Sequence, residues 1–130
     1  MEKKKIRSFH IMFIDNDKHV RDSLKVFFEN SQTKVLIFKS ASEGLNSLKY
    51  HNVDVVISDY FLADMDGIEF LTRVAKIHPD TKRILMATIT IDDLEQQIVR
   101  AGIDRFIEKP LSVASLDTII NELKIMNLSK

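Results

Sequence analysis

Short runs of apolar, mostly β-branched residues alternate with amphipathic segments along the whole chain. Runs of this length and composition are typical of buried β-strands. They predict strands over residues 9–14, 34–38, 53–58, 83–87 and 104–108. Between the runs, apolar residues recur at the spacing of an α-helix, as Val20, Leu24, Phe27 and Phe28 do. Helices are therefore predicted over about 17–30, 40–50, 66–78, 92–101 and 112–126.

The predicted helix ends carry residues that satisfy free backbone groups. A serine or aspartate followed three residues later by glutamate predicts a capping box. Such pairs are Ser40 with Glu43, Asp66 with Glu69, and Asp92 with Glu95, while Asp17 and Ser112 are expected to be simple N-caps and Gly102 a C-cap. Gly44 falls inside the second predicted helix, where glycine costs about 1 kcal/mol relative to alanine.

The strict alternation of strands and helices predicts an α/β fold, with a doubly wound parallel sheet. Each parallel connection needs a crossover, and these crossovers are right-handed. The third strand is apolar on both faces apart from Asp54, as expected where helices cover both sides of a sheet. In such open sheets, ligand sites lie beyond the carboxyl ends of the strands.

Four of the predicted strands end at residues with useful chemistry, namely Asp15, Asp59, Thr88 and Lys109. If the strands are parallel, these side chains gather at one edge of the sheet. A carboxylate such as Asp59 is a suitable nucleophile toward phosphorus, and a lysine ammonium group suits phosphoryl oxygens. This combination indicates phosphoryl transfer.

Composition narrows the class of protein. The 130 residues suit one domain, taken as 1–130 with a core of about 7–126, and 19 basic residues balance 19 acidic ones, which disfavours direct nucleic-acid binding. The basic cluster around Lys3 and Arg7 is expected to be a solvated tail. Cysteine is absent, which excludes disulfides and thiol chemistry. Neither a membrane span nor a signal peptide is evident, so a cytoplasmic protein is expected.

Over residues 7–126 the chain resembles a response-regulator receiver domain. The resemblance rests on the aspartate-containing turn after the first strand, Asp59 with Gly67 eight residues later, Thr88, Ala101-Gly102 and Lys109-Pro110. It implies a flavodoxin-like sheet of order 2-1-3-4-5, in which a sensor histidine kinase or phosphotransfer protein phosphorylates Asp59. It also implies a Mg²⁺ ion bound by Asp15, Asn16, Asp59 and the backbone carbonyl of Phe61.

The same resemblance implies a conformational switch. Thr88 would move toward the phosphoryl group, Phe106 would turn inward behind it, and Lys109 would contact the phosphoryl oxygens. The face formed by the fourth helix, fifth strand and fifth helix would then be recognised by a partner or by a second copy of the chain.

The sequence departs from the family at four places. Asn16 replaces the second of two usual aspartates, so Mg²⁺ binding is expected to be weaker. Ile89 replaces a small residue and is expected to narrow access to the site. Leu62-Ala63 replaces the usual Met-Pro, which predicts a less rigid loop. The segment from Thr88 to Gly102 is about one residue short, which predicts an altered loop before the fourth helix.

Two other functions compete with the phosphorylated switch. Asn16 and Ile89 are compatible with a degenerate receiver that binds proteins or dimerises without phosphorylation. Asp15-Asn16-Asp17 also resembles the motif of haloacid-dehalogenase-type phosphatases, with Asp15 as nucleophile and Asp17 as general acid and base. An enzyme of that type would not explain why Gly67 follows Asp59 by eight residues.

Overall fold

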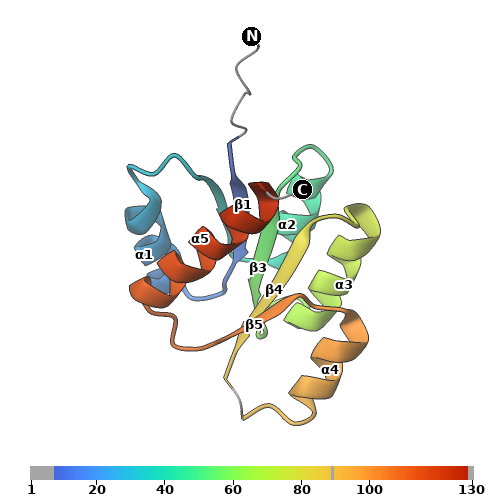
Figure 1. Ribbon diagram of the computed structural model, residues 1–130. Helices are drawn as coiled ribbons and strands as arrows, with labels where there is room; N and C mark the ends of the chain where they lie inside the picture. Colours follow the sequence, from blue (N-terminus) through green and yellow to red (C-terminus); the bar gives the residue numbers. More distant parts are fainter. Residues whose placement is uncertain (1–7, 89, 129–130) are drawn as a thin grey trace.

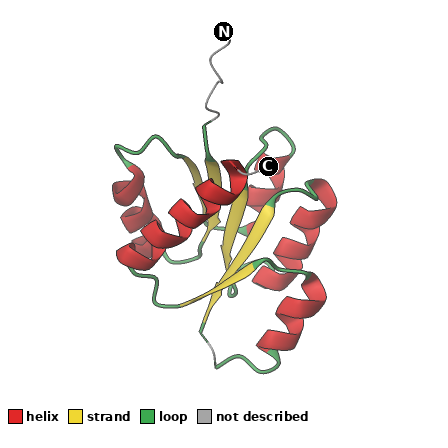
Figure 2. Ribbon diagram, in the orientation of Figure 1, coloured by secondary structure: helices red, strands yellow, loops and turns green. Residues whose placement is uncertain are grey.

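The computed structural model describes residues 8–88 and 90–128, which form a five-stranded parallel sheet covered by helices (Figures 1 and 2). The strands are β1 (His10–Ile14), β2 (Lys34–Phe38), β3 (Val55–Asp59), β4 (Lys82–Ala87) and β5 (Arg105–Glu108). Their order is β2-β1-β3-β4-β5, which confirms the predicted topology. The third strand includes Asp59, where the sequence pattern predicted an end at Ser58.

Helices pack against both faces of the sheet. They are α1 (Lys18–Phe28), α2 (Ala41–Leu48), α3 (Gly67–Ile77), α4 (Leu94–Ala101) and α5 (Val113–Leu128). Helices α1 and α5 lie on one face, and α2, α3 and α4 lie on the other (Figure 1).

Alternating side chains along each strand feed two separate cores, because successive residues point to opposite faces. In β1, Ile11 and Phe13 join the core beneath α1 and α5, while Met12 and Ile14 join the core beneath α2, α3 and α4. All four side chains are fully buried. This explains why the strands are apolar at consecutive positions rather than at every second one.

Most of the predicted caps are confirmed. The side chains of Asp17, Ser40 and Asp66 accept hydrogen bonds from the first-turn amides of α1, α2 and α3, and Ser112 Oγ accepts one from Ser115 N. Gly102 has a φ of 66° and ends α4, as expected for a C-cap glycine.

The predicted capping box of Asp92 with Glu95 is wrong. Helix α4 begins at Leu94, and its N-cap is Asp93, which has a φ of 57° and makes no side-chain cap hydrogen bond. Because the chain enters α4 through this left-handed residue, Asp92 lies one residue too early to cap the helix. That this loop differs from the loop common in the family stays a prediction.

Gly44 has a packing reason that sequence alone did not reveal. A Cβ atom at this position would lie 2.6 Å from Ile14 Cδ1 and 3.2 Å from Phe70 Cζ. Glycine therefore allows α2 to approach β1 and α3 closely, in exchange for its lower helix propensity.

Two predicted features fall outside the described residues: the basic cluster around Lys3 and Arg7, and Ile89. Within residues 8–88 and 90–128, no helix has the length and apolar character needed to cross a membrane.

Candidate functional site

The alternation of side chains brings Asp15, Asp59 and Lys109 to the same edge and the same face of the sheet. Asp15 follows Ile14, Asp59 is the last residue of β3, and Lys109 follows Glu108. Each continues the row that supplies the core beneath α1 and α5, through Phe13, Ile57 and Ile107 respectively. Three strand ends therefore aim their last side chains into one site.

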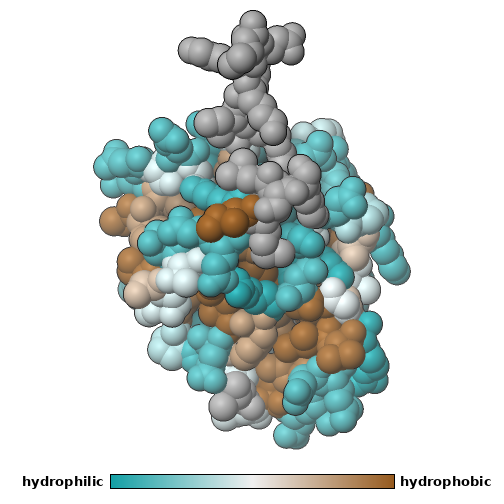
Figure 3. Space-filling model, in the orientation of Figure 1, coloured by the Kyte–Doolittle hydropathy of each residue, from teal (hydrophilic) through white to brown (hydrophobic). Residues whose placement is uncertain are grey.

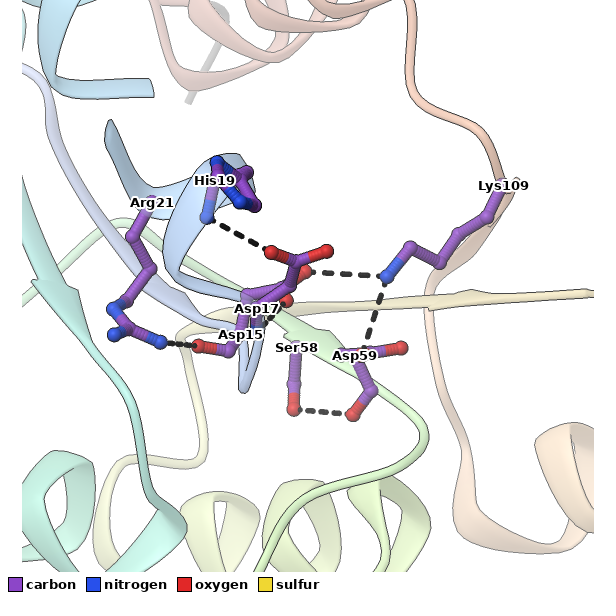
Figure 4. Close-up of polar contacts among 7 residues, drawn as sticks. All are labelled: Asp15, Asp17, His19, Arg21, Ser58, Asp59 and Lys109. Atoms are coloured by element: carbon purple, nitrogen blue, oxygen red, sulfur yellow. Dashed lines mark hydrogen bonds and ion pairs between the residues drawn. The ribbon is translucent and has the colours of Figure 1, made fainter. Parts of the chain in front are cut away.

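Lys109 lies between the two carboxylates (Figure 4). Its Nζ is 3.2 Å from Asp59 Oδ2 and 3.3 Å from Asp15 Oδ2. The Asp15 side chain is fully buried, the Asp59 side chain is 11% exposed, and the Lys109 side chain is 22% exposed. One cation thus faces two nearly buried anions, leaving the trio with a formal charge of about −1 at neutral pH.

Asp15 is held firmly by its surroundings. Its Oδ1 accepts a hydrogen bond from Asp17 N at 2.8 Å, and its backbone carbonyl accepts one from Arg21 Nη1 at 2.9 Å (Figure 4). Its backbone N–H donates to Phe38 O at 3.1 Å, at the end of β2. Oδ2 is therefore the Asp15 oxygen that faces Lys109 and the site.

The electrostatics of the trio follow from this arrangement. Burial raises the pKa of Asp59, and the neighbouring Asp15 raises it further, against the opposing effect of Lys109. For Lys109, burial opposes the charged form, but the two carboxylates outweigh it and raise the pKa of Lys109 above its usual value. Lys109 is therefore an ammonium ion at neutral pH, available to neutralise anionic oxygens near Asp59.

The loop after Asp59 explains the spacing to Gly67. Gly67 N donates to Tyr60 O at 2.6 Å, and Phe61 pairs with Asp66 in an antiparallel bridge. A Cβ atom on Gly67 would collide with the backbone carbonyl oxygen of Asp59. The first turn of α3 therefore packs directly on the backbone of Asp59, and glycine is required there.

The other predicted site residues are less closely engaged. Thr88 lines the same cavity, but its hydroxyl is hydrogen-bonded to Thr90 Oγ1 at 3.0 Å. Asn16 is exposed beside Asp15. Phe61 lines the cavity with a side chain that is 65% exposed, and Phe106 lies half-buried against the core beneath α4.

A cavity of about 630 Å³ opens from the carboxylates and Lys109. It continues between α1 and α5, where its walls include Val20, Phe27, Leu111 and Leu116. The sequence pattern predicts that Val20 and Phe27 lie on the apolar face of a helix, but it does not indicate that they border a cavity. Sequence reasoning also missed the hydrogen bonds that join the Asp64 carboxylate to the first turn of α2.

The donor set suits Mg²⁺, which prefers oxygen ligands and is usually held by one or two carboxylates while keeping several water molecules. Asp15 and Asp59 offer two carboxylates, and no group of three or more His, Cys, Asp or Glu side chains within the described part of the chain is placed to hold a metal ion. The protein therefore presents a sparse site with few charged ligands.

Response regulators are similar to this chain in sequence. The response regulator protein VraR of Staphylococcus aureus (strain N315) is 28% identical over 109 residues, covering 82% of this chain and 52% of that protein. The transcriptional regulatory protein GlrR of Escherichia coli (strain K12) is 25% identical over 113 residues, covering 87% of this chain and 26% of that protein. The chain thus spans between a quarter and about half of the length of these relatives.

Solved structures of receiver domains have the same fold as this chain. A response regulator receiver domain protein from Methanospirillum hungatei JF-1 superposes with a TM-score of 0.84 at 26% identity, covering 95% of this chain and all of the other. The signal receiver domain of an HD domain-containing protein from Pseudomonas fluorescens Pf-5 has the same fold, with a TM-score of 0.88 at 23% identity and coverage of 98% and 95%. The family model for the response regulator receiver domain matches residues 11–121, and the chain belongs to that family of two-component signalling domains.

Proposed function

We propose that this receiver domain accepts a phosphoryl group on Asp59 from a sensor histidine kinase or a phosphotransfer protein. The observation that carries the proposal is the position of Lys109, 3.2 Å from Asp59 Oδ2, at the mouth of an open cavity. In the transfer, an Asp59 oxygen attacks phosphorus, the phosphorus–nitrogen bond of phosphohistidine breaks, and the imidazole leaves with its electron pair and takes up a proton. The product is an acyl phosphate on Asp59.

Charge is the main obstacle, because an anion attacks an anion. Lys109 is already paired with both carboxylates, so it is positioned to follow the negative charge onto the phosphoryl oxygens. Its raised pKa keeps that charge present at physiological pH. Asp15 holds Lys109 from the opposite side and keeps the ammonium group close to Asp59.

Asp15, Asp59 and the backbone carbonyl of Phe61, with Asn16 beside them, are the residues that would hold Mg²⁺. When bound, Mg²⁺ supplies positive charge to the phosphoryl oxygens. Asn16 contributes no negative charge, so the affinity is expected to be lower than with two aspartates in sequence.

The switch would connect this site to the face made by α4, β5 and α5. Apolar residues gather over α4 and β5 (Figure 3), where Ile91, Ile98 and Phe106 border a hollow of about 670 Å³. Transfer to Asp59 would draw the Thr88 hydroxyl away from Thr90 and allow Phe106 to repack. The altered face would then be recognised by a target protein or by a second copy of the chain.

Two alternative functions compete with this proposal, a degenerate receiver and a phosphatase. A degenerate receiver is favoured by the exposed Asn16 and by Thr88, whose hydroxyl is occupied by Thr90. The phosphatase interpretation is disfavoured because Asp17 Oδ1 accepts a hydrogen bond from His19 N and thus caps α1. The domain is proposed to act in the cytoplasm, where the phosphoryl donor reaches Asp59. It is not expected to bind nucleic acid or a membrane directly.

Intact-mass measurement tests the proposal. Incubation with acetyl phosphate and Mg²⁺ is expected to add one phosphoryl group to the wild-type chain and none to Asp59→Asn. A matched control is Asp80→Asn, which removes an exposed carboxylate before β4, at the opposite edge of the sheet, and should retain phosphorylation. Absence of phosphorylation and of any NMR response to beryllofluoride in the wild-type chain would favour the degenerate receiver. Steady release of phosphate from small esters, abolished by Asp15→Asn, would instead support the phosphatase.

A further inference from the structure

We propose that Asp64 is a positioning residue that fastens the loop after Asp59 to helix α2. Asp64 lies in the loop between β3 and α3, yet its carboxylate accepts hydrogen bonds from the first turn of α2. The donors Ala41 and Ser42 are 23 and 22 residues away in sequence. The loop that carries Phe61 is thereby attached to a second element of the fold.

The contacts of Asp64 are specific. Oδ1 accepts a hydrogen bond from Ala41 N at 3.1 Å, and Oδ2 accepts from Ser42 N at 2.8 Å and from Ser42 Oγ at 2.6 Å. The hydroxyl of Ser42 and the two backbone amides hold the pKa of Asp64 below its usual value, which shows that they favour the charged form. Both oxygens of the carboxylate are used.

These contacts complete the start of α2. The first amides of a helix have no partner within it and need one from elsewhere. Ser40 Oγ accepts from Glu43 N at 3.2 Å, whereas Ala41 N and Ser42 N are satisfied by Asp64. Helix α2 is therefore capped partly by its own segment and partly by the loop after Asp59.

Helix α2 is a rigid support for the loop. Its residues Ala41 and Leu48 are buried, and Gly44 brings it close to Ile14, the residue before Asp15. The base of the loop is held by the hydrogen bond from Gly67 N to Tyr60 O. Asp64 adds a second fixed point near the exposed Ala63, in a loop that has no proline to stiffen it.

The consequence for the site rests on the proposed function of Asp59. With the loop fastened at both points, the Phe61 carbonyl has a defined position relative to Asp15 and Asp59, as metal binding requires. Without Asp64, the loop keeps its base but loses its attachment to α2. Mg²⁺ affinity is then expected to fall, although Asp64 does not belong to the proposed ligand set.

The experiment compares Asp64→Ala with Ser40→Ala, measured in the full chain. Both variants remove a cap from the start of α2, but Ser40→Ala leaves the loop after Asp59 attached. Backbone ¹⁵N relaxation and amide exchange report the order of residues 61–65 and the opening of the Gly67 amide, and neither needs metal or phosphorylation. Titration with Mg²⁺ alone then reports the affinity of the site.

In Asp64→Ala, order parameters of residues 61–65 are expected to fall, the Gly67 amide to exchange roughly tenfold faster, and Mg²⁺ to bind at least about threefold more weakly. Ser40→Ala should show none of these changes beyond its loss of thermal stability. Asp64→Asn, which keeps one acceptor oxygen, should fall between wild type and Asp64→Ala, and serves if Asp64→Ala does not fold. Equal loop dynamics in the wild type and both Asp64 variants would overturn the proposal. If the wild-type chain bound no Mg²⁺ and accepted no phosphoryl group, the proposed function would fail, while the relaxation data would still decide the role of Asp64.

Discussion

The ammonium group of Lys109 lies 3.2 Å from Asp59 Oδ2, and Asp15 contacts the same group from another strand end. The three residues come from segments separated by as many as 94 positions in sequence. Because both carboxylates are nearly buried, each depends on Lys109 for compensation of its charge.

Replacing Lys109 by methionine is expected to destabilise the protein by about 2 kcal/mol, since it leaves two carboxylates facing each other without a cation. Urea unfolding would measure the loss. Lys109→Arg, which keeps the charge, should lose less. Adding Asp59→Asn to Lys109→Met should recover more stability than Asp59→Asn adds to the wild-type protein, because it also removes one of the two unpaired charges. Strictly additive effects would contradict the coupling of these two residues.

Asp59→Asn is expected to stabilise the domain by about 1 kcal/mol at neutral pH, because burial and the neighbouring Asp15 disfavour the ionised form of this carboxylate. The raised pKa of Asp59 means that the folded state binds a proton more tightly than the unfolded chain. The cost of the ionised carboxylate is therefore complete above the folded pKa, and it disappears as the pH falls toward the unfolded value of about 4. The difference in melting temperature between Asp59→Asn and wild type should shrink accordingly in acid. A difference that grew with falling pH would refute this assignment, and Asp80→Asn provides the surface control.

Gly44→Ala is expected to cost about 1–2 kcal/mol in the free energy of unfolding, despite the better helix propensity of alanine. The new methyl group would meet Ile14 Cδ1, which lies in the fully buried core. Ile14→Val removes that atom. Thermal or urea unfolding of the double variant should therefore show a smaller loss than the sum of the single losses, whereas a stabilised Gly44→Ala protein would show that α2 can move away from β1.

Asn16→Asp is expected to raise the affinity for Mg²⁺ by roughly tenfold, which corresponds to about 1.4 kcal/mol. The substitution adds a negative charge next to Asp15 in a site with two carboxylates. Titration followed by NMR or calorimetry measures the change. Asn30→Asp adds the same charge at an exposed position after α1 and should have a much smaller effect.

Thr90→Val removes the partner that holds the Thr88 hydroxyl at 3.0 Å. Freed from that hydrogen bond, Thr88 should reach a phosphoryl mimic more readily, and beryllofluoride should bind about two- to fivefold more tightly. Fluorine or backbone NMR follows the titration. An unchanged affinity in Thr90→Val would indicate that the Thr88–Thr90 contact does not oppose the switch.

Much of the site was predictable, because it depends on where strands end. Asp15, Asp59 and Lys109 each terminate an apolar run, and the alternation of strands with helices places such ends at one edge of a parallel sheet. The local caps Asp17, Ser40 and Asp66 were equally accessible, since each acts on amides two or three residues away. The cap expected at Asp92 failed because Asp93 adopts a left-handed conformation, which the sequence pattern did not indicate.

The sequence by itself determined the class of fold, the order of its elements and the residue types at the carboxyl edge, because these follow from periodicity and short-range hydrogen bonding. Only the tertiary structure decided that Lys109 lies between two carboxylates, that Thr88 is bonded to Thr90, that Gly44 must lack a side chain, and that Asp64 caps a distant helix. Most of these depend on distances between segments remote in sequence, and the Thr88–Thr90 contact depends on the local path of the chain after β4. Such distances arise only when helices and strands pack together.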